Sequence, residues 1–189
     1  MSNVIYIEDS GQFKLDRANR LLAGIPSGVW KAAHGAITRA ADKAKTESGR
    51  FAAEQYTISK GTFMSHVRIK TKLSGGSGGV ASATVLFAGS VIPLIQFRTQ
   101  FTKDGGVSVS VKKGGGGVLA HAFVANIGGT NIYERIGKPR FPIEKKYGPS
   151  AAHMMMDGTV EENMEKVIVE TFNNRIEHEI TRVLNGWGG

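Results

Sequence analysis

The residues with the clearest potential for chemistry are cations gathered between residues 132 and 156. Two acids, Glu134 and Glu144, stand against five bases, which are Arg135, Lys138, Arg140, Lys145 and Lys146. Cations at this density can bind phosphate groups or acidic protein surfaces, because both carry negative charge. The stretch is therefore a candidate binding surface for an acidic or phosphate-rich partner.

A nucleotide-binding loop is excluded at Gly137 and Lys138. A phosphate loop needs a second glycine five residues before Gly137, where this chain has Ile132, and a hydroxyl residue for magnesium where it has Pro139. The glycine runs at 75–79 and 114–117 lie between predicted strands. They therefore lack the helix N-terminus that makes such loops bind phosphate.

Catalytic and metal-binding patterns are also missing from the sequence. There is no Cys, so a thiol nucleophile or thiolate metal site is impossible. The histidines are scattered singly, without the spacing of a metallohydrolase, at His34, His66, His121, His153 and His178. A hydrolytic function has only these isolated residues behind it. We expect no enzyme, no cofactor and no metal site.

The cationic stretch also contains prolines and glycines that predict a rigid joint between a sheet and a helix. We expect turns at 137–139 and 148–149, with a short extended piece at 141–143 between them, because each Pro biases its predecessor away from helix. Pro149 and Ser150 are suited to open a helix. The residues of this predicted joint are Gly137, Pro139, Pro142, Gly148, Pro149 and Ser150.

Before this joint, apolar spacing predicts helices and then strands. The expected helical segments are 15–22, ended by Gly24-Ile25-Pro26, 29–47 after Ser27, and a turn or two at 51–58. The expected strands are 4–8, 67–73, 80–87, 92–101, 107–112 and 118–127. Alternation in the strand 67–73 places Arg68, Lys70 and Lys72 on one face, as a second group of candidate contacts.

After the joint, a long helix is predicted from Thr159 to Leu184, with a capping box formed by Thr159 and Glu162. Met154, Met155 and Met156 cannot all face one core, so at least one should point outward; core filling and partner contact both stay open for the cluster. The predicted fold is α+β: an antiparallel sheet of hairpins with extended glycine-rich loops, packed by an N-terminal helix and a long C-terminal helix. Residues 1–189 are expected to form one domain, with flexible hairpin excursions at about 74–79, 102–106 and 113–117.

The charge is unevenly distributed along the chain. The net charge is +8, yet residues 157–189 hold seven acids and three bases, so residues 1–156 carry +12. This basic body favours acidic or phosphate-rich partners. The N-terminus lacks the basic region of a secretory signal, and the longest strongly apolar run, Val91-Ile92-Pro93-Leu94-Ile95, is too short for a membrane span. We expect a soluble protein without a membrane partner.

Several spaced motifs resemble the phage minor tail protein Z family, which overlaps with tail completion and head-tail joining proteins of tailed phages. They are Arg135-x-Gly137-Lys138-x-Arg140-x-Pro142-Ile143, Gly148-Pro149-Ser150, Phe87-x-Gly89, Ile92-Pro93-Leu94 with Phe97, and Ala122-Phe123-Val124-Ala125. The order of predicted elements over about residues 29–184 is similar too. The glycine insertions at 75–79 and 114–117, Ala151 and the Trp187-Gly188-Gly189 tail depart from the family pattern.

The resemblance implies a structural virion protein at the head-proximal end of a phage tail, in the neck, which is made in the host cytoplasm. It implies a homo-oligomeric ring of six copies whose lumen passes DNA, with other tail and neck proteins as partners. Both groups of cations then become candidate contacts to a neighbouring subunit or, without base recognition, to genomic DNA in the channel. The alternative is a sequence-independent nucleic-acid-binding module, which would bind free DNA with a steep salt dependence.

Overall fold

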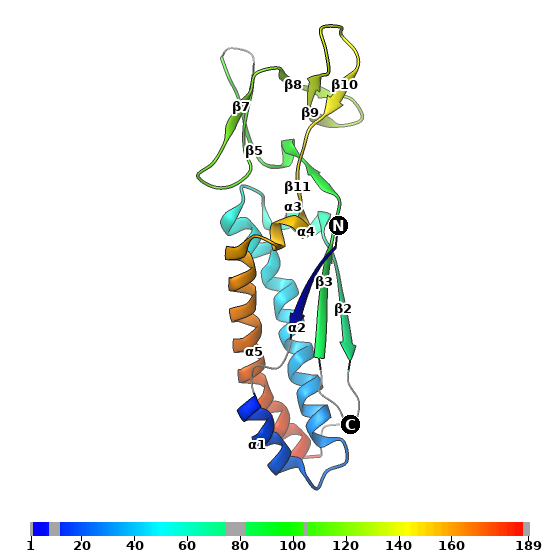
Figure 1. Cartoon of the computed structure of the whole chain (residues 1–189), viewed down its shortest axis with the longest axis vertical. Helices are drawn as coiled ribbons and strands as arrows, with labels where there is room; N and C mark the ends of the chain where they lie inside the picture. The colour runs from blue at the N-terminus through cyan, green and yellow to red at the C-terminus, as the bar shows by residue number, and fades with distance from the viewer. Residues whose placement is uncertain (1, 8–11, 75–81, 104–105, 187–189) are drawn as a thin grey trace. The chain divides into compact units, whose positions relative to one another are not determined.

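The computed structural model describes residues 2–7, 12–74, 82–103 and 106–186, and their contacts group into two compact units (Figure 1). The helical unit consists of Ser2–Ser48, Ile69–Phe87 and residues 161–186, and the hairpin unit of Gly49–Arg68 and Ala88–Val160. The predicted α+β class is confirmed, with antiparallel hairpin sheets and a long C-terminal helix. The single domain over 1–189 stays a prediction.

The helical unit contains β1 (Ser2–Ile7), α1 (Gln12–Leu22), β2 (Arg68–Ser74), β3 (Ser82–Ala88) and most of α2 (Gly28–Gln55) and α5 (Gly158–Leu184). The three strands form a sheet in the order β1-β3-β2. Figure 1 shows α2 between α5 and the strands β2 and β3. The predicted strand at 4–8 and the helices at 15–22 and 29–47 are confirmed, and α2 extends to Gln55, so it includes the first part of the helical turns expected at 51–58.

Small residues set the contact between α2 and α5 inside this unit. Alanines on α2 are fully buried, as the small-residue stripe predicts, and α5 buries Met164, Ile168 and Ile176. At Gly35 an added Cβ would lie 2.8 Å from the carboxyl carbon of Glu179. The Glu179 side chain therefore packs directly against α2, because Gly35 has no side chain.

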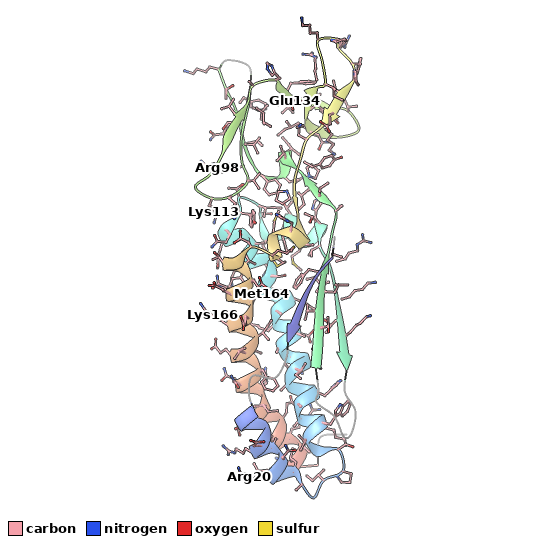
Figure 2. All side chains as sticks on the ribbon, viewed as in Figure 1. Arg20, Arg98, Lys113, Glu134, Met164 and Lys166 are labelled. Atoms are coloured by element: carbon pink, nitrogen blue, oxygen red, sulfur yellow. The ribbon has the colours of Figure 1, made fainter. Side chains whose placement is uncertain are left out.

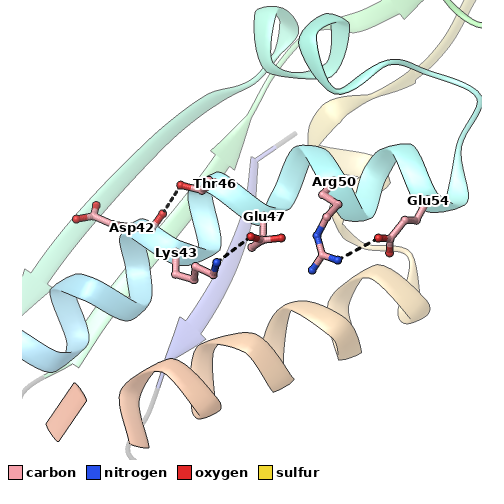
Figure 3. A network of polar contacts seen from close by, with 6 residues as sticks. All are labelled: Asp42, Lys43, Thr46, Glu47, Arg50 and Glu54. Carbon is pink, nitrogen blue, oxygen red and sulfur yellow. Dashed lines mark hydrogen bonds and ion pairs between the residues drawn. The ribbon is translucent and has the colours of Figure 1, made fainter. Parts of the chain in front are cut away.

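The exposed face of α2 is paired along its own helix (Figure 3). Lys43 contacts Glu47 at 3.0 Å and Arg50 contacts Glu54 at 3.3 Å, each four residues apart. The Thr46 hydroxyl donates to the carbonyl of Asp42. These pairs stabilise an exposed helix by a few tenths of a kcal/mol each.

The hairpin unit contains short antiparallel sheets. Its elements are α3 (Lys60–His66), β4 (Val91–Pro93), η1 (Leu94–Gln96), β5 (Arg98–Phe101), β6 (Val107–Ser110), β7 (Gly117–Leu119), β8 (Ala122–Asn126), β9 (Thr130–Arg135), β10 (Ile143–Lys145), β11 (Tyr147–Ser150) and α4 (Ala151–Met155). The strand orders are β5-β6-β7, β10-β9-β8 and β11-β4.

Two predicted strands are interrupted, and one short helix was not predicted. The strand expected over 92–101 is interrupted by η1, which begins after Pro93, and the strand expected over 118–127 divides at Ala120 and His121. Helix α3 immediately precedes the strand predicted over 67–73, and its Phe63 is fully buried. The Ser59 hydroxyl accepts from the Thr62 backbone N–H and so caps this short helix.

The joint also differs from its prediction in one place. The turn expected at Gly148 and Pro149 is wrong, because both lie in β11, whose Tyr147 pairs with Pro93 of β4. The register is irregular between Tyr147 and Ser150, so Pro149 stands where a missing N–H breaks no regular ladder. The helix predicted after Ser150 is confirmed as α4, and the Ser150 hydroxyl accepts from the His153 N–H.

The next helix is capped by Asp157 and not by Thr159, the residue that the predicted capping box assigns. Helix α5 begins at Gly158, and the Asp157 carboxylate accepts from the Thr159 N–H at 3.3 Å. Met154 and Met155 are fully buried while Met156 is 54% exposed, which confirms that at least one methionine points outward. Of the predicted loops, 75–79 and 104–105 lie outside the described residues, and 113–117 connects β6 to β7.

Candidate interaction surface

A hollow of about 610 Å³ lies beside β8 and the start of the β9–β10 connection. The lining consists of three small residues, the basic side chains of Arg135 and Lys138, and the rings of His121 and Phe123. The lining residues are Ala120, His121, Ala122, Phe123, Arg135, Gly137 and Lys138. This hollow brings together Arg135 and Lys138, two of the eight cations that the sequence selects.

The register of β8 and β9 positions the Arg135 side chain. Phe123 pairs directly with Tyr133, and Arg135 is two residues further on the same face of β9. The rings of Phe123 and Tyr133 are stacked with centroids 6.3 Å apart, and the Arg135 guanidinium lies 5.1 Å from the Phe123 centroid. The Tyr133 hydroxyl donates to the carbonyl of Ile127 at 2.9 Å. An exposed cation is thus held against a ring that is itself fixed by a neighbour.

Lys146 differs from these cations because acids compensate its charge. Its ammonium lies 2.9 Å from the Glu134 carboxylate and 3.4 Å from that of Glu144. The hydrogen bond to Glu134 is the main reason that the pKa of Lys146 is raised above its usual value. Figure 2 labels Glu134 in this part of the hairpin unit. Lys146 therefore has a structural partner and is a poor candidate for an outside contact.

Two more predicted cations lie over exposed rings. The Arg140 guanidinium is 5.8 Å from the Phe141 centroid, and the Lys145 ammonium is 5.3 Å from that of Tyr147. Contacts of this kind contribute about 0.5–1 kcal/mol at exposed sites. They present a charge and an apolar surface together, which suits a partner that is both acidic and partly apolar.

The cations of β2 form a separate group in the sequence, and they are divided between the two units. Arg68, Lys70 and Lys72 are exposed and alternate with half-buried Ile69 and Thr71, so the predicted alternation is confirmed. Arg68 belongs to the hairpin unit and the two lysines to the helical unit. None of the three pairs with an acid in the part of the chain that the structure describes.

Exposed apolar side chains are concentrated in the hairpin unit, and the sequence reasoning did not single them out. Phe101 ends β5 at 76% exposure, and Ile136 and Phe141 flank the β9–β10 connection at 67% and 62%. Val118 on β7 and Ile127 after β8 are also more than half exposed. An apolar residue beside a turn-forming residue, such as Phe141 before Pro142, could have indicated them. We refer to these five residues as the apolar tips.

Hydrogen-bonded ionisable groups also meet in the hairpin unit, around Asp157. The Tyr56 hydroxyl donates to its carboxylate at 3.2 Å, and Lys112 forms an ion pair with it. Burial, followed by the nearby charge of Asp157 and the hydrogen bond to it, raises the pKa of Tyr56 to about 12. The hydrogen bond from Lys112 is the main cause that lowers the pKa of Asp157. Tyr56 is only 4% exposed, so its hydroxyl and the Asp157 carboxylate form a largely buried contact that supports the fold.

Within the described residues, no group of three or more His, Cys, Asp or Glu side chains could hold a metal ion. His66 Nδ1 lies 2.9 Å from the Thr62 carbonyl, and the His34 ring packs on Trp30 at 4.8 Å. Among the described helices, none is both long and apolar enough to cross a membrane. Comparison of the chain with protein-family models, curated proteins and solved structures found no match.

Proposed function

We propose that this chain is a structural virion protein that completes the head-proximal end of a phage tail and helps join the tail to the head. It acts as a homo-oligomeric ring around the DNA channel, in contact with other tail and neck proteins, and it is not an enzyme. The motifs from Phe87 to Ser150 support the family assignment. The apolar tips support a role in assembly.

The apolar tips are the observation that carries this proposal. Large exposed apolar side chains occur beside both three-stranded sheets of the hairpin unit, and apolar surface of this kind can mark protein contact sites. Strands β7 and β10 stand at the edges of their sheets, where unpaired backbone groups can bind a neighbouring strand. We take a second copy of this chain as the occupant, since contact between two different surfaces of identical subunits gives a ring when the rotation closes and a filament when it does not.

The experiment compares Ile136→Ser/Phe141→Ser with Leu21→Ser/Leu184→Ser in the full-length protein. All four side chains are exposed, but the second pair belongs to the helical unit. We expect the wild type and the second variant to sediment as a closed oligomer and the first variant to dissociate, with unchanged melting. Mass spectrometry of virions should detect the wild-type chain. A wild type that stays monomeric at high concentration and is absent from virions would contradict the proposal.

A second candidate is a sequence-independent nucleic-acid-binding module, which the cationic hollow favours. Its seven lining residues include Arg135 and Lys138 and contain no acid. This function requires tight binding of free DNA by the isolated protein with a steep salt dependence. Weak and salt-insensitive binding of free DNA would remove this candidate and leave the ring assembly intact.

A further inference from the structure

We propose that the hollow lined by His121, Phe123, Arg135 and Lys138 is a binding site for the phosphodiester backbone of DNA. This inference rests on the proposed function, because a ring around a channel brings DNA to its subunits. It goes further by selecting one site among the cations of the chain. It also assigns Phe123 a positioning role.

The charges of the hairpin unit favour this site over the neighbouring cations. Lys146 is compensated by Glu134 and Glu144, whereas Arg135 and Lys138 form no ion pair within the described residues. With no acid in the lining, the hollow presents two positive charges and the ring nitrogens of His121. Phosphate oxygens accept hydrogen bonds from these groups without any reading of base sequence.

The stack under Arg135 prepares its guanidinium for a phosphate. The Arg135 guanidinium carbon lies over the Phe123 ring, 5.1 Å from its centroid, and the Tyr133 ring stacks with that of Phe123. The edge of a stacked guanidinium stays free to donate two parallel hydrogen bonds to phosphate oxygens. Because the side chain is held before binding, less conformational entropy is lost on contact.

The hollow has room for an extended ligand such as a phosphate chain. A space of about 610 Å³ falls in the range of about 300–1,000 Å³ that is usual for organic ligands. Because the hollow is open to solvent on one side, a phosphodiester with its sugars can lie across it. Ala120, Ala122 and Gly137 keep this space clear because their side chains are small.

The test measures binding of a short labelled DNA duplex of mixed sequence to the full-length protein over a series of salt concentrations. Arg135→Gln/Lys138→Gln removes the two cations of the hollow. Lys103→Gln/Lys113→Gln removes the same charge from exposed positions of the hairpin unit outside the hollow. We expect the first variant to lose at least tenfold in affinity and about 1.8 in the salt slope, since each neutralised phosphate contributes about 0.9. The control should lose less than about threefold, because its cations make no such contact.

Phe123→Leu separates positioning from charge. It keeps an apolar side chain but removes the ring, so affinity should fall several-fold while the salt slope stays near that of the wild type. Equal losses in the two charge variants would overturn the site, because net charge alone would then explain binding. Equal binding of polyglutamate and DNA through Arg135 and Lys138 would overturn the assignment to phosphate.

Sedimentation of the same variants distinguishes this site from the proposed assembly. An Arg135→Gln/Lys138→Gln ring that forms normally and loses DNA supports the site. A variant that dissociates while its subunits bind DNA as tightly as the wild type overturns it, because the cations would then be subunit contacts. A wild-type monomer that binds DNA through the hollow would contradict the ring and leave the site standing.

Discussion

The Tyr56 hydroxyl donates a hydrogen bond of 3.2 Å to the Asp157 carboxylate, although the two residues are 101 positions apart in the chain. The bond joins the residue that follows α2 to the residue that precedes α5, both within the hairpin unit. Lys112, from the segment after β6, pairs with the same carboxylate. One acid therefore receives polar contacts from two segments that are far from it in sequence.

Tyr56→Phe should change stability at high pH. Burial raises the pKa of Tyr56 from 10.0 to about 12, so its neutral form is favoured in the folded state. Stability should be fully present below about pH 10 and should decrease as the pH rises toward 12, by about 2–3 kcal/mol at 1.36 kcal/mol per unit. Urea unfolding across this range measures the change.

Tyr56→Phe should remove most of this alkaline loss, because it has no hydroxyl to ionise. Tyr147→Phe is the matched control, since Tyr147 is about half exposed. Its alkaline unfolding should follow the wild type. An alkaline transition that is unchanged in Tyr56→Phe would show that another group controls it.

Asp157→Asn should alter how stability changes at low pH, whereas Tyr56→Phe alters how it changes at high pH. The pKa of Asp157 is lowered in the folded state, chiefly by the hydrogen bond from Lys112. Its contribution is therefore present above the unfolded value of about 3.9 and is lost as the pH falls through the folded pKa. Thermal unfolding between neutral and acidic pH should show this loss in the wild type.

The Asp157→Asn variant should be less stable than the wild type at neutral pH, and its melting temperature should fall less on acidification. Asp42→Asn is the control, because Asp42 is exposed and pairs only with a partly exposed Lys45 among the described ion pairs. Parallel pH profiles for Asp157→Asn and the wild type would refute the assigned role.

Alanine substitutions at Met154 and Met156, two positions apart, should differ strongly in their effect on the unfolding free energy. Met154→Ala removes a fully buried side chain and should cost about 2–5 kcal/mol of unfolding free energy. Met156→Ala should stay within about 0.5 kcal/mol, because Met156 is exposed in the monomer. Urea denaturation of the two variants decides between these values. Equal costs would contradict the observed burial.

The same two variants address the alternative of partner contact that the sequence leaves open for this cluster. If Met156 contacts another subunit, Met156→Ala should weaken association without changing the melting of the monomer. Sedimentation at several concentrations measures that effect. Wild-type association in Met156→Ala would leave core filling by Met154 and Met155 as the role of the run.

Local periodicity accounts for the parts of the fold that were predicted correctly. Helices α2 and α5 each carry an apolar stripe over many turns, so their existence and contact faces follow from spacing alone. Helix α3 has one buried residue, Phe63, and so offers no stripe to recognise. Strand β11 was missed because a Gly-Pro pair locally favours a turn, while its partner Pro93 lies far away in sequence.

The candidate site was predicted only in part, because its contacts join residues on different strands. The sequence names Arg135 and Lys138 only together with six other cations, and their neighbours depend on the register between β8 and β9. That register places Phe123 beneath Arg135, and a pairing with β10 places Lys145 opposite Tyr133. Glu134 compensates Lys146 across the same hairpin. Cross-strand contacts of this kind are not visible in the sequence of one strand.

Gly148 provides the sharpest test of packing at the joint. A Cβ at this position would lie 2.7 Å from Cε2 and 3.1 Å from Cζ of Phe97, whose ring is buried. Gly148→Ala should therefore force the ring to move and cost about 1–3 kcal/mol, as overpacking usually does. Gly117→Ala is the control, because nothing lies within 4 Å of its added Cβ.

A double-mutant cycle with Phe97→Leu shows whether the ring is the obstacle. Phe97→Leu alone should destabilise the hairpin unit, since it removes buried apolar surface. In Gly148→Ala/Phe97→Leu the total cost should be smaller than the sum of the two single costs, because the new methyl group no longer meets the ring. Additive costs would place the conflict elsewhere in the joint and would contradict the contact between Gly148 and Phe97.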